Sequence, residues 1–145
     1  MIERSTLDMQ VLAGQPVSAD ALKAALTDTP PPDANLLYLY AERLLLHALD
    51  NRDVEAASLV ARLMDADPVL DDRLYRILND TLHIQPDAVY AFMRVRVNEK
   101  PDARWLPRLK LAALFSLRVA INDGSAETIT NWLTLVAREP ANYEL

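Results

Sequence analysis

Residue types that commonly carry catalysis are sparse in this 145-residue chain. It contains no cysteine, so the sequence excludes thiol catalysis, disulfides, Cys-ligated zinc and iron–sulfur clusters. Its two histidines, His47 and His83, fall in different segments without an HExxH pattern, so a metal site would need distant carboxylates. Because the chain has only two glycines, Gly14 and Gly124, a glycine-rich phosphate-binding loop is excluded as well.

The acidic run DADPVLDD around Pro68 superficially resembles a calcium-binding loop. An EF-hand loop needs a glycine at its sixth position and a glutamate at its twelfth, and neither is present. Asp67 instead suits the N-cap of a helix that begins at Pro68, with Asp71 and Asp72 near the positive end of its dipole. No GxSxG elbow brings serine, histidine and acid together, and Glu42 is expected in an ion pair. We therefore predict no catalytic residue, no metal and no cofactor.

The distribution of charge is the most informative chemical feature. The whole chain carries a net charge of −6 with a pI near 4.8, but residues 94–118 hold seven basic residues against only Glu99 and Asp102. This +5 stretch is either a solvated face or a docking surface for an acidic partner or the acidic half of another copy. Six of these basic residues and one tryptophan of the same stretch are the candidate partner-binding residues: Arg94, Arg96, Arg104, Trp105, Arg108, Lys110 and Arg118.

Trp105 differs from the other aromatic residues, which fall mostly on apolar stripes. It lies in a loop, flanked by Arg104 and Arg108. Such a tryptophan is either a lid on the core or an anchor at an interface with a partner.

The elements that must position these residues are helices separated by prolines. Three 16-residue segments, 53–68, 86–101 and 125–140, begin at residues suited to a helix start and end on a proline. A further helix is expected before each one, at 34–49, 68–83 and 107–121. The clearest apolar stripe includes Trp132, whose replacement by alanine is expected to cost about 3–5 kcal/mol.

These patterns predict an all-α fold of stacked antiparallel helix hairpins, as a repeat-like array or a helical bundle, in a single domain spanning residues 1–145. Residues 1–32 form an N-terminal helical cap, with short helices at 6–13 and 18–27 and a proline linker. Residues 33–140 form three hairpins, and residues 141–145 form a tail. Residues 93–97 alternate apolar and basic like an edge strand, but their helical flanks favour a helix.

Helix pairs of about 35 residues that close on a proline resemble the tetratricopeptide repeat. The first pair matches best, with Tyr40 at a large position, Ala56 at a small one, Val60 at the next apolar site and Pro68 at the end. Several positions depart from the family pattern, and a HEAT-like or unclassified hairpin stack stays open: Arg43, Leu44, Val89, Arg96 and Thr128. The resemblance implies a surface that holds a peptide or partner helix, and no catalysis.

Together these features predict a non-enzymatic protein–protein interaction module, an adaptor or small chaperone that holds a partner peptide or helix. Small acidic chains of this kind are similar to the cytosolic chaperones of bacterial type III secretion. The alternatives are a homo-oligomer, a nucleic-acid-associated protein that uses residues 94–118, and an enzyme or its regulatory subunit. The negative net charge argues against general nucleic-acid binding.

We expect a cytoplasmic protein without membrane contact. The most apolar window, 36–49, is too short to span a membrane, and residues 1–8 lack a secretory apolar run.

Overall fold

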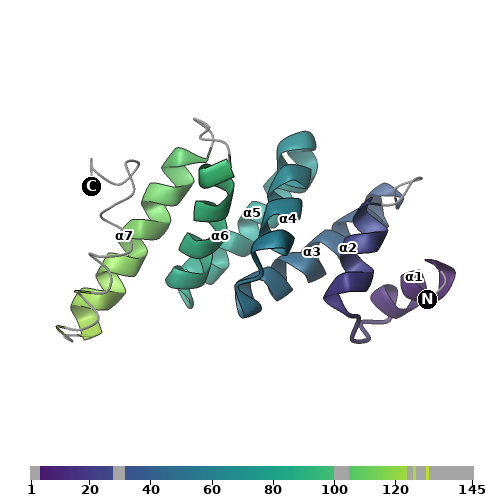
Figure 1. The fold of residues 1–145 in the computed structure, drawn as a ribbon, viewed down its shortest axis with the longest axis horizontal. Coiled ribbons are helices and arrows are strands. Elements are labelled where there is room, and N and C mark those ends of the chain that lie inside the picture. Colours follow the sequence, from purple (N-terminus) through teal and green to yellow (C-terminus); the bar gives the residue numbers. More distant parts are fainter. Residues whose placement is uncertain (1–3, 28–31, 100–104, 124–125, 127–129, 131–145) are drawn as a thin grey trace. The chain divides into compact units, whose positions relative to one another are not determined.

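The computed structural model of the chain is all-α, which confirms the predicted fold class (Figure 1). It describes residues 4–27, 32–99 and 105–123, together with residues 126 and 130. Helices and no strands occur in the described part: α1 (Arg4–Leu12), α2 (Ala19–Thr27), α3 (Ala34–Asn51), α4 (Val54–Ala66), α5 (Pro68–Leu82), α6 (Pro86–Glu99) and α7 (Leu106–Asp123). Apart from residues 126 and 130, the predicted second helix of the third hairpin, at 125–140, lies outside the described residues, as does the predicted tail at 141–145.

Aspartate side chains fix where three of these helices begin. Asp33, Asp53 and Asp67 each accept hydrogen bonds from backbone amides two or three residues ahead, at 3.0–3.3 Å. These amides belong to the first turn, where no helical carbonyl is available to them. The predicted starts of α3, α4 and α5 are therefore confirmed at the level of individual atoms.

The strand-like run at residues 93–97 is helical and lies within α6. Met93, Arg96 and Val97 are buried, whereas Val95 is half-buried. Their spacing of three and four residues is that of one helix face, whereas a strand would bury every second residue. The prediction of a helix here is confirmed.

By its internal contacts the chain divides into two compact units, Met1–Leu74 and Tyr75–Leu145. The boundary falls inside α5. The reason lies in which helices touch: α3 contacts α1, α2 and α4, and α2 also contacts α4, while α6 packs against α7. Large residues are fully buried in both units, in the first Tyr40, Leu44, Leu45, Val60 and Met64, and in the second Val89, Met93, Trp105 and Leu109.

Candidate functional site

The seven predicted partner-binding residues differ widely in exposure. Arg104 lies outside the described residues. Arg118 is exposed on α7, while Arg94, Arg108 and Lys110 are half-buried. Arg96 and Trp105 are 5% and 0% exposed. The expectation that all seven residues line one docking surface is therefore wrong for Arg96 and Trp105, because the fold buries both side chains.

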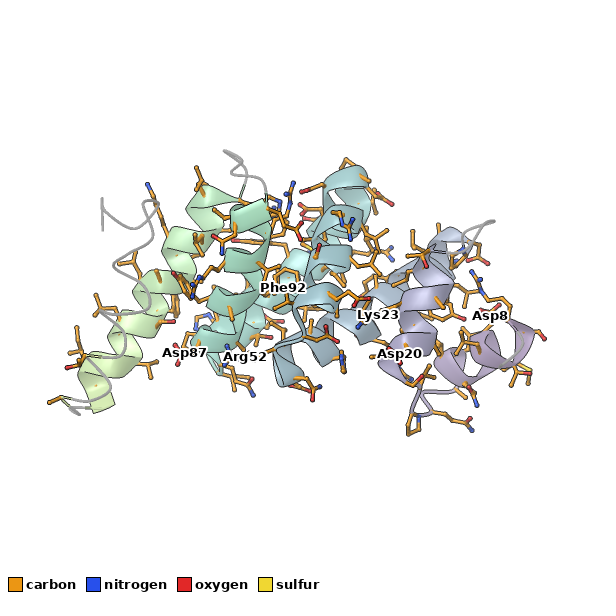
Figure 2. All side chains as sticks on the ribbon, in the orientation of Figure 1. Asp8, Asp20, Lys23, Arg52, Asp87 and Phe92 are labelled. Atoms are coloured by element: carbon orange, nitrogen blue, oxygen red, sulfur yellow. The ribbon has the colours of Figure 1, made fainter. Side chains whose placement is uncertain are left out.

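Trp105 serves as a lid on the core of the second unit. Its indole lies near the ring of Phe92 on α6, a residue labelled in Figure 2. The two ring centroids are 6.3 Å apart, and the ring planes are tilted by 50°. The guanidinium of Arg108 lies 4.9 Å from its ring centroid. Because no part of the side chain reaches the surface, the fold favours the lid over the partner anchor, the two roles that the sequence left open.

Arg108 stacks on aromatic rings within the second unit. Its guanidinium also lies 4.0 Å from the ring centroid of Tyr75, so one cation on α7 stacks on rings of α5 and of the loop residue Trp105. A planar guanidinium is weakly hydrated and well suited to such stacking. This charge was predicted as part of an exposed face, and its structural role was missed because Tyr75 is 33 residues away in sequence.

Arg96 is buried for a reason that helical periodicity explains. It shares the core-facing side of α6 with Met93 and Val97, at spacings of three and one residues. Its long aliphatic stem adds to the packing even though its head is charged. The count of basic residues in the sequence therefore overstates the positive charge that this helix presents to solvent.

The outer face of α7 carries exposed apolar residues that the sequence analysis did not single out. Leu111, Leu114 and Ile121 are 38%, 43% and 59% exposed. The opposite side of α7 contains Leu109, Ala112 and Ala113, all fully buried, and this helix packs against α6. A signal was present in the sequence, since apolar residues occur all around this helix and exceed what one packed face requires.

A second cluster, also missed from sequence, joins three helices of the first unit around Asp53. Its Oδ2 accepts a hydrogen bond at 2.9 Å from Nζ of Lys23 on α2, a residue labelled in Figure 2. The same oxygen lies 2.9 Å from Nε2 of His47 on α3. Its Oδ1 accepts from the amide of Ala56 at the start of α4. Nδ1 of His47 lies 3.2 Å from the side-chain amide nitrogen of Asn51, so a ring that donates from Nε2 and accepts at Nδ1 forms both hydrogen bonds.

The electrostatics of this Asp53 cluster fit an ion-pair link rather than acid–base chemistry. The hydrogen bond from Lys23, with those from Ala56 and His47, holds the pKa of Asp53 well below its usual range. The same bond raises the pKa of Lys23 above its usual value. Both groups thus keep their charge at neutral pH, which makes the carboxylate a poor base and the ammonium a poor nucleophile. The Asp53 cluster therefore links α2, α3 and α4.

Two tyrosines of α3 take part in further polar contacts of the first unit. The hydroxyl of Tyr40 donates to Asp8 on α1, and burial, followed by this bond, raises the pKa of Tyr40 well above its usual value. Burial, followed by the nearby Glu42, also raises the pKa of Tyr38, whose ring lies 5.1 Å beneath the guanidinium of Arg73. Glu42, expected in an ion pair, therefore has a tyrosine hydroxyl as a neighbour.

The described residues offer no obvious place for a metal. Among them, no group of three or more His, Asp or Glu side chains converges. His83 lies edge-on to Phe115, with ring centroids 5.3 Å apart, and Asp67 acts as the predicted helix cap. Nor does any helix within the described ranges have the length and apolar character needed to cross a bilayer.

Comparison with known proteins returned no match: no protein family, curated protein or solved structure is significantly similar to this chain.

Proposed function

We propose that the chain is a non-enzymatic protein–protein interaction module, an adaptor or small chaperone of tetratricopeptide-like helix pairs that holds a segment of a partner protein. The observation that carries this proposal is the row of exposed apolar side chains on α7, opposite the buried side of this helix. Single exposed apolar residues are ordinary, but a row along one helix is typical of a surface that a partner covers.

The polar clusters of the first unit support a structural role for its charges. Asp53 is engaged by a lysine, a histidine and a backbone amide, and Tyr40 is hydrogen-bonded to Asp8. An enzyme would need groups poised to exchange protons near neutral pH, whereas Asp53 and Lys23 are held in their charged forms. The proposal therefore places function in surface recognition.

Association with nucleic acid is the weaker alternative. Of the basic residues in 94–118, Arg96 is buried and Arg108 stacks on two rings. Fewer cations are then left to displace counterions from phosphates, and the chain as a whole carries −6. Binding to DNA or RNA would weaken steeply with salt, so a salt titration separates this alternative from the recognition of a protein segment.

The proposed function is tested by crosslinking in cells that express the chain from its own gene. A photoreactive amino acid at position 114, on the exposed row, should capture a defined protein, whereas the same group at the exposed Asp20 of α2 serves as control. The captured protein is then purified, recombined with the chain and studied by calorimetry. A saturable complex of fixed stoichiometry supports the proposal, and failure of every purified candidate to bind overturns it.

A further inference from the structure

We infer that the outer face of α7 binds an amphipathic helical segment of another protein whose apolar side is flanked by acidic residues. This inference rests on the proposed function and specifies the chemistry of the partner. The binding surface, named here the α7 row, consists of Leu111, Leu114, Arg118 and Ile121, with Lys110 at its edge.

The helical geometry makes the α7 row continuous. Its members follow one another at three, four and three residues, which places them on one side of α7. Leu109, Ala112 and Ala113 are fully buried on the other side. A row of this length spans about 15 Å, which matches roughly three turns of a partner helix. Its three apolar members are 38–59% exposed, so a partner helix can remove substantial apolar surface from water.

The charge on α7 determines what kind of segment fits. From Leu106 to Asn122 this helix has three basic residues and no acidic one, and its single acid, Asp123, is the last residue. Arg118 lies within the α7 row. Lys110, which also has an interaction within the chain, lies beside the first member of the row. A segment with carboxylates near both ends of an apolar side would meet a cation at each end. The apolar contact would then supply affinity, and the charges would set register and encounter rate.

The same charges disfavour a second copy of this chain as the occupant. Lys110 and Arg118 lie four residues on either side of Leu114. If two α7 rows paired antiparallel around Leu114, Lys110 of one copy would face Arg118 of the other. If they paired in parallel, each cation would face itself. Both symmetric arrangements bring like charges together. An extended anionic surface, such as a membrane, would be repelled by the net charge of −6.

Because the 145 residues include no cysteine, the α7 row can be tested directly with an introduced thiol. Leu114→Cys introduces a unique thiol on the row, and Val69→Cys introduces one at an exposed apolar position of the first unit. The probe is a synthetic 18-residue helical peptide with leucines along one side and glutamates at both ends. Two matched peptides carry lysines in place of the glutamates, or alanines in place of the leucines.

Only the peptide with leucines and glutamates should bind, as measured by fluorescence anisotropy. It should also slow maleimide labelling at position 114 at least about fivefold and leave labelling at position 69 unchanged. Leu111→Gln with Leu114→Gln should weaken binding about tenfold, because two partly exposed leucines no longer contribute apolar contact. The matched control, Val54→Gln with Val69→Gln, should bind normally, and circular dichroism verifies that both variants remain helical.

Three results would overturn the inference. Equal binding of the lysine-flanked peptide would show that the charges are irrelevant. Labelling at position 114 as slow as at a buried Ala112→Cys would show that another part of the chain covers the α7 row. Concentration-dependent dimerisation abolished by the double Gln variant would assign the row to a second copy. If the partner found by crosslinking binds the double Gln variant as well as the native chain, the inference fails while the proposed function stands.

Discussion

In the unit Met1–Leu74 two of the described polar links between helices run through carboxylates: Asp8 joins α1 to α3, and Asp53 joins α2, α3 and the start of α4. In the unit Tyr75–Leu145 the described links between helices run through rings, as in the pairs of Phe92 with Trp105 and His83 with Phe115. Sequence composition matches this difference. The first unit has 13 acidic and 6 basic residues, while the second has 8 acidic and 9 basic. Both units have a buried core, but the first also has links between helices whose charge pH can remove.

The largest expected effect is on the second unit. Trp105→Ala should lower its free energy of unfolding by about 3–5 kcal/mol, because a large and fully buried side chain leaves a cavity. Hydrogen exchange measured helix by helix should show faster exchange in α6 and α7 and little change in α1–α4. If the amides of α3 lose protection as much as those of α6, the two units do not respond separately and the comparison fails.

The next effect belongs to the first unit. Asp53→Ala should cost about 2–3 kcal/mol, since it removes a helix cap together with charge-assisted hydrogen bonds. Chemical denaturation monitored by circular dichroism measures the loss. Asp33→Ala is the matched control, because the hydrogen bonds described for Asp33 go to backbone amides at the exposed start of α3. Its cost should stay near 1 kcal/mol, roughly that of a cap alone. Equal losses in the two variants would show that Asp53 acts only as a helix cap and does not link the three helices.

A smaller effect is expected from the stacked arginine. Arg108→Ala should destabilise the second unit by about 1–2 kcal/mol, because a guanidinium 4.0 Å from the ring of Tyr75 contributes both packing and attraction to the ring face. The exposed Arg118→Ala should change thermal stability by less than about 0.5 kcal/mol. A loss for Arg118→Ala as large as that for Arg108→Ala would show that stacking is not the source of the difference.

The smallest expected effect is the dependence of the first unit on acid. The folded pKa of Asp53 is lowered, so its contribution is fully present above its unfolded value near 3.8 and is lost as pH falls toward the folded value. Between pH 4 and pH 3 this amounts to about 1 kcal/mol for one carboxylate. Denaturation of the native chain and of Asp53→Asn at both pH values measures this contribution of Asp53 to the free energy of unfolding. A difference between the two proteins that does not shrink in acid would contradict the assignment.

Local signals in the sequence were sufficient to predict the helices. Asp33, Asp53 and Asp67 precede apolar stripes and do cap α3, α4 and α5, because capping depends only on residues within one turn. The contacts of the candidate site depend on packing between distant residues instead. Lys23 is 30 residues from Asp53, and no periodicity in the sequence indicates that α2 brings it within hydrogen-bonding distance.

The basic stretch shows a second limit of prediction from sequence. Counting charges in residues 94–118 revealed an excess of cations but not their directions. Burial of Arg96 follows from its place on the core side of α6, and stacking of Arg108 follows from the position of Tyr75 on another helix. For Trp105 the arginine neighbours in sequence left two roles open, a lid on the core and an interface anchor, and the fold buries the whole ring.

Asp53 also has a consequence for how freely this protein can vary. At an ordinary N-cap, aspartate, asparagine and serine are nearly interchangeable because each accepts from a backbone amide. At position 53 the second carboxylate oxygen also forms hydrogen bonds with the ammonium of Lys23 and the imidazole of His47. The single hydroxyl of serine or the single amide oxygen of asparagine cannot accept all of these bonds and the backbone bond together. In a saturation library of viable sequences, positions 33 and 67 should accept all three residue types, while position 53 should retain aspartate.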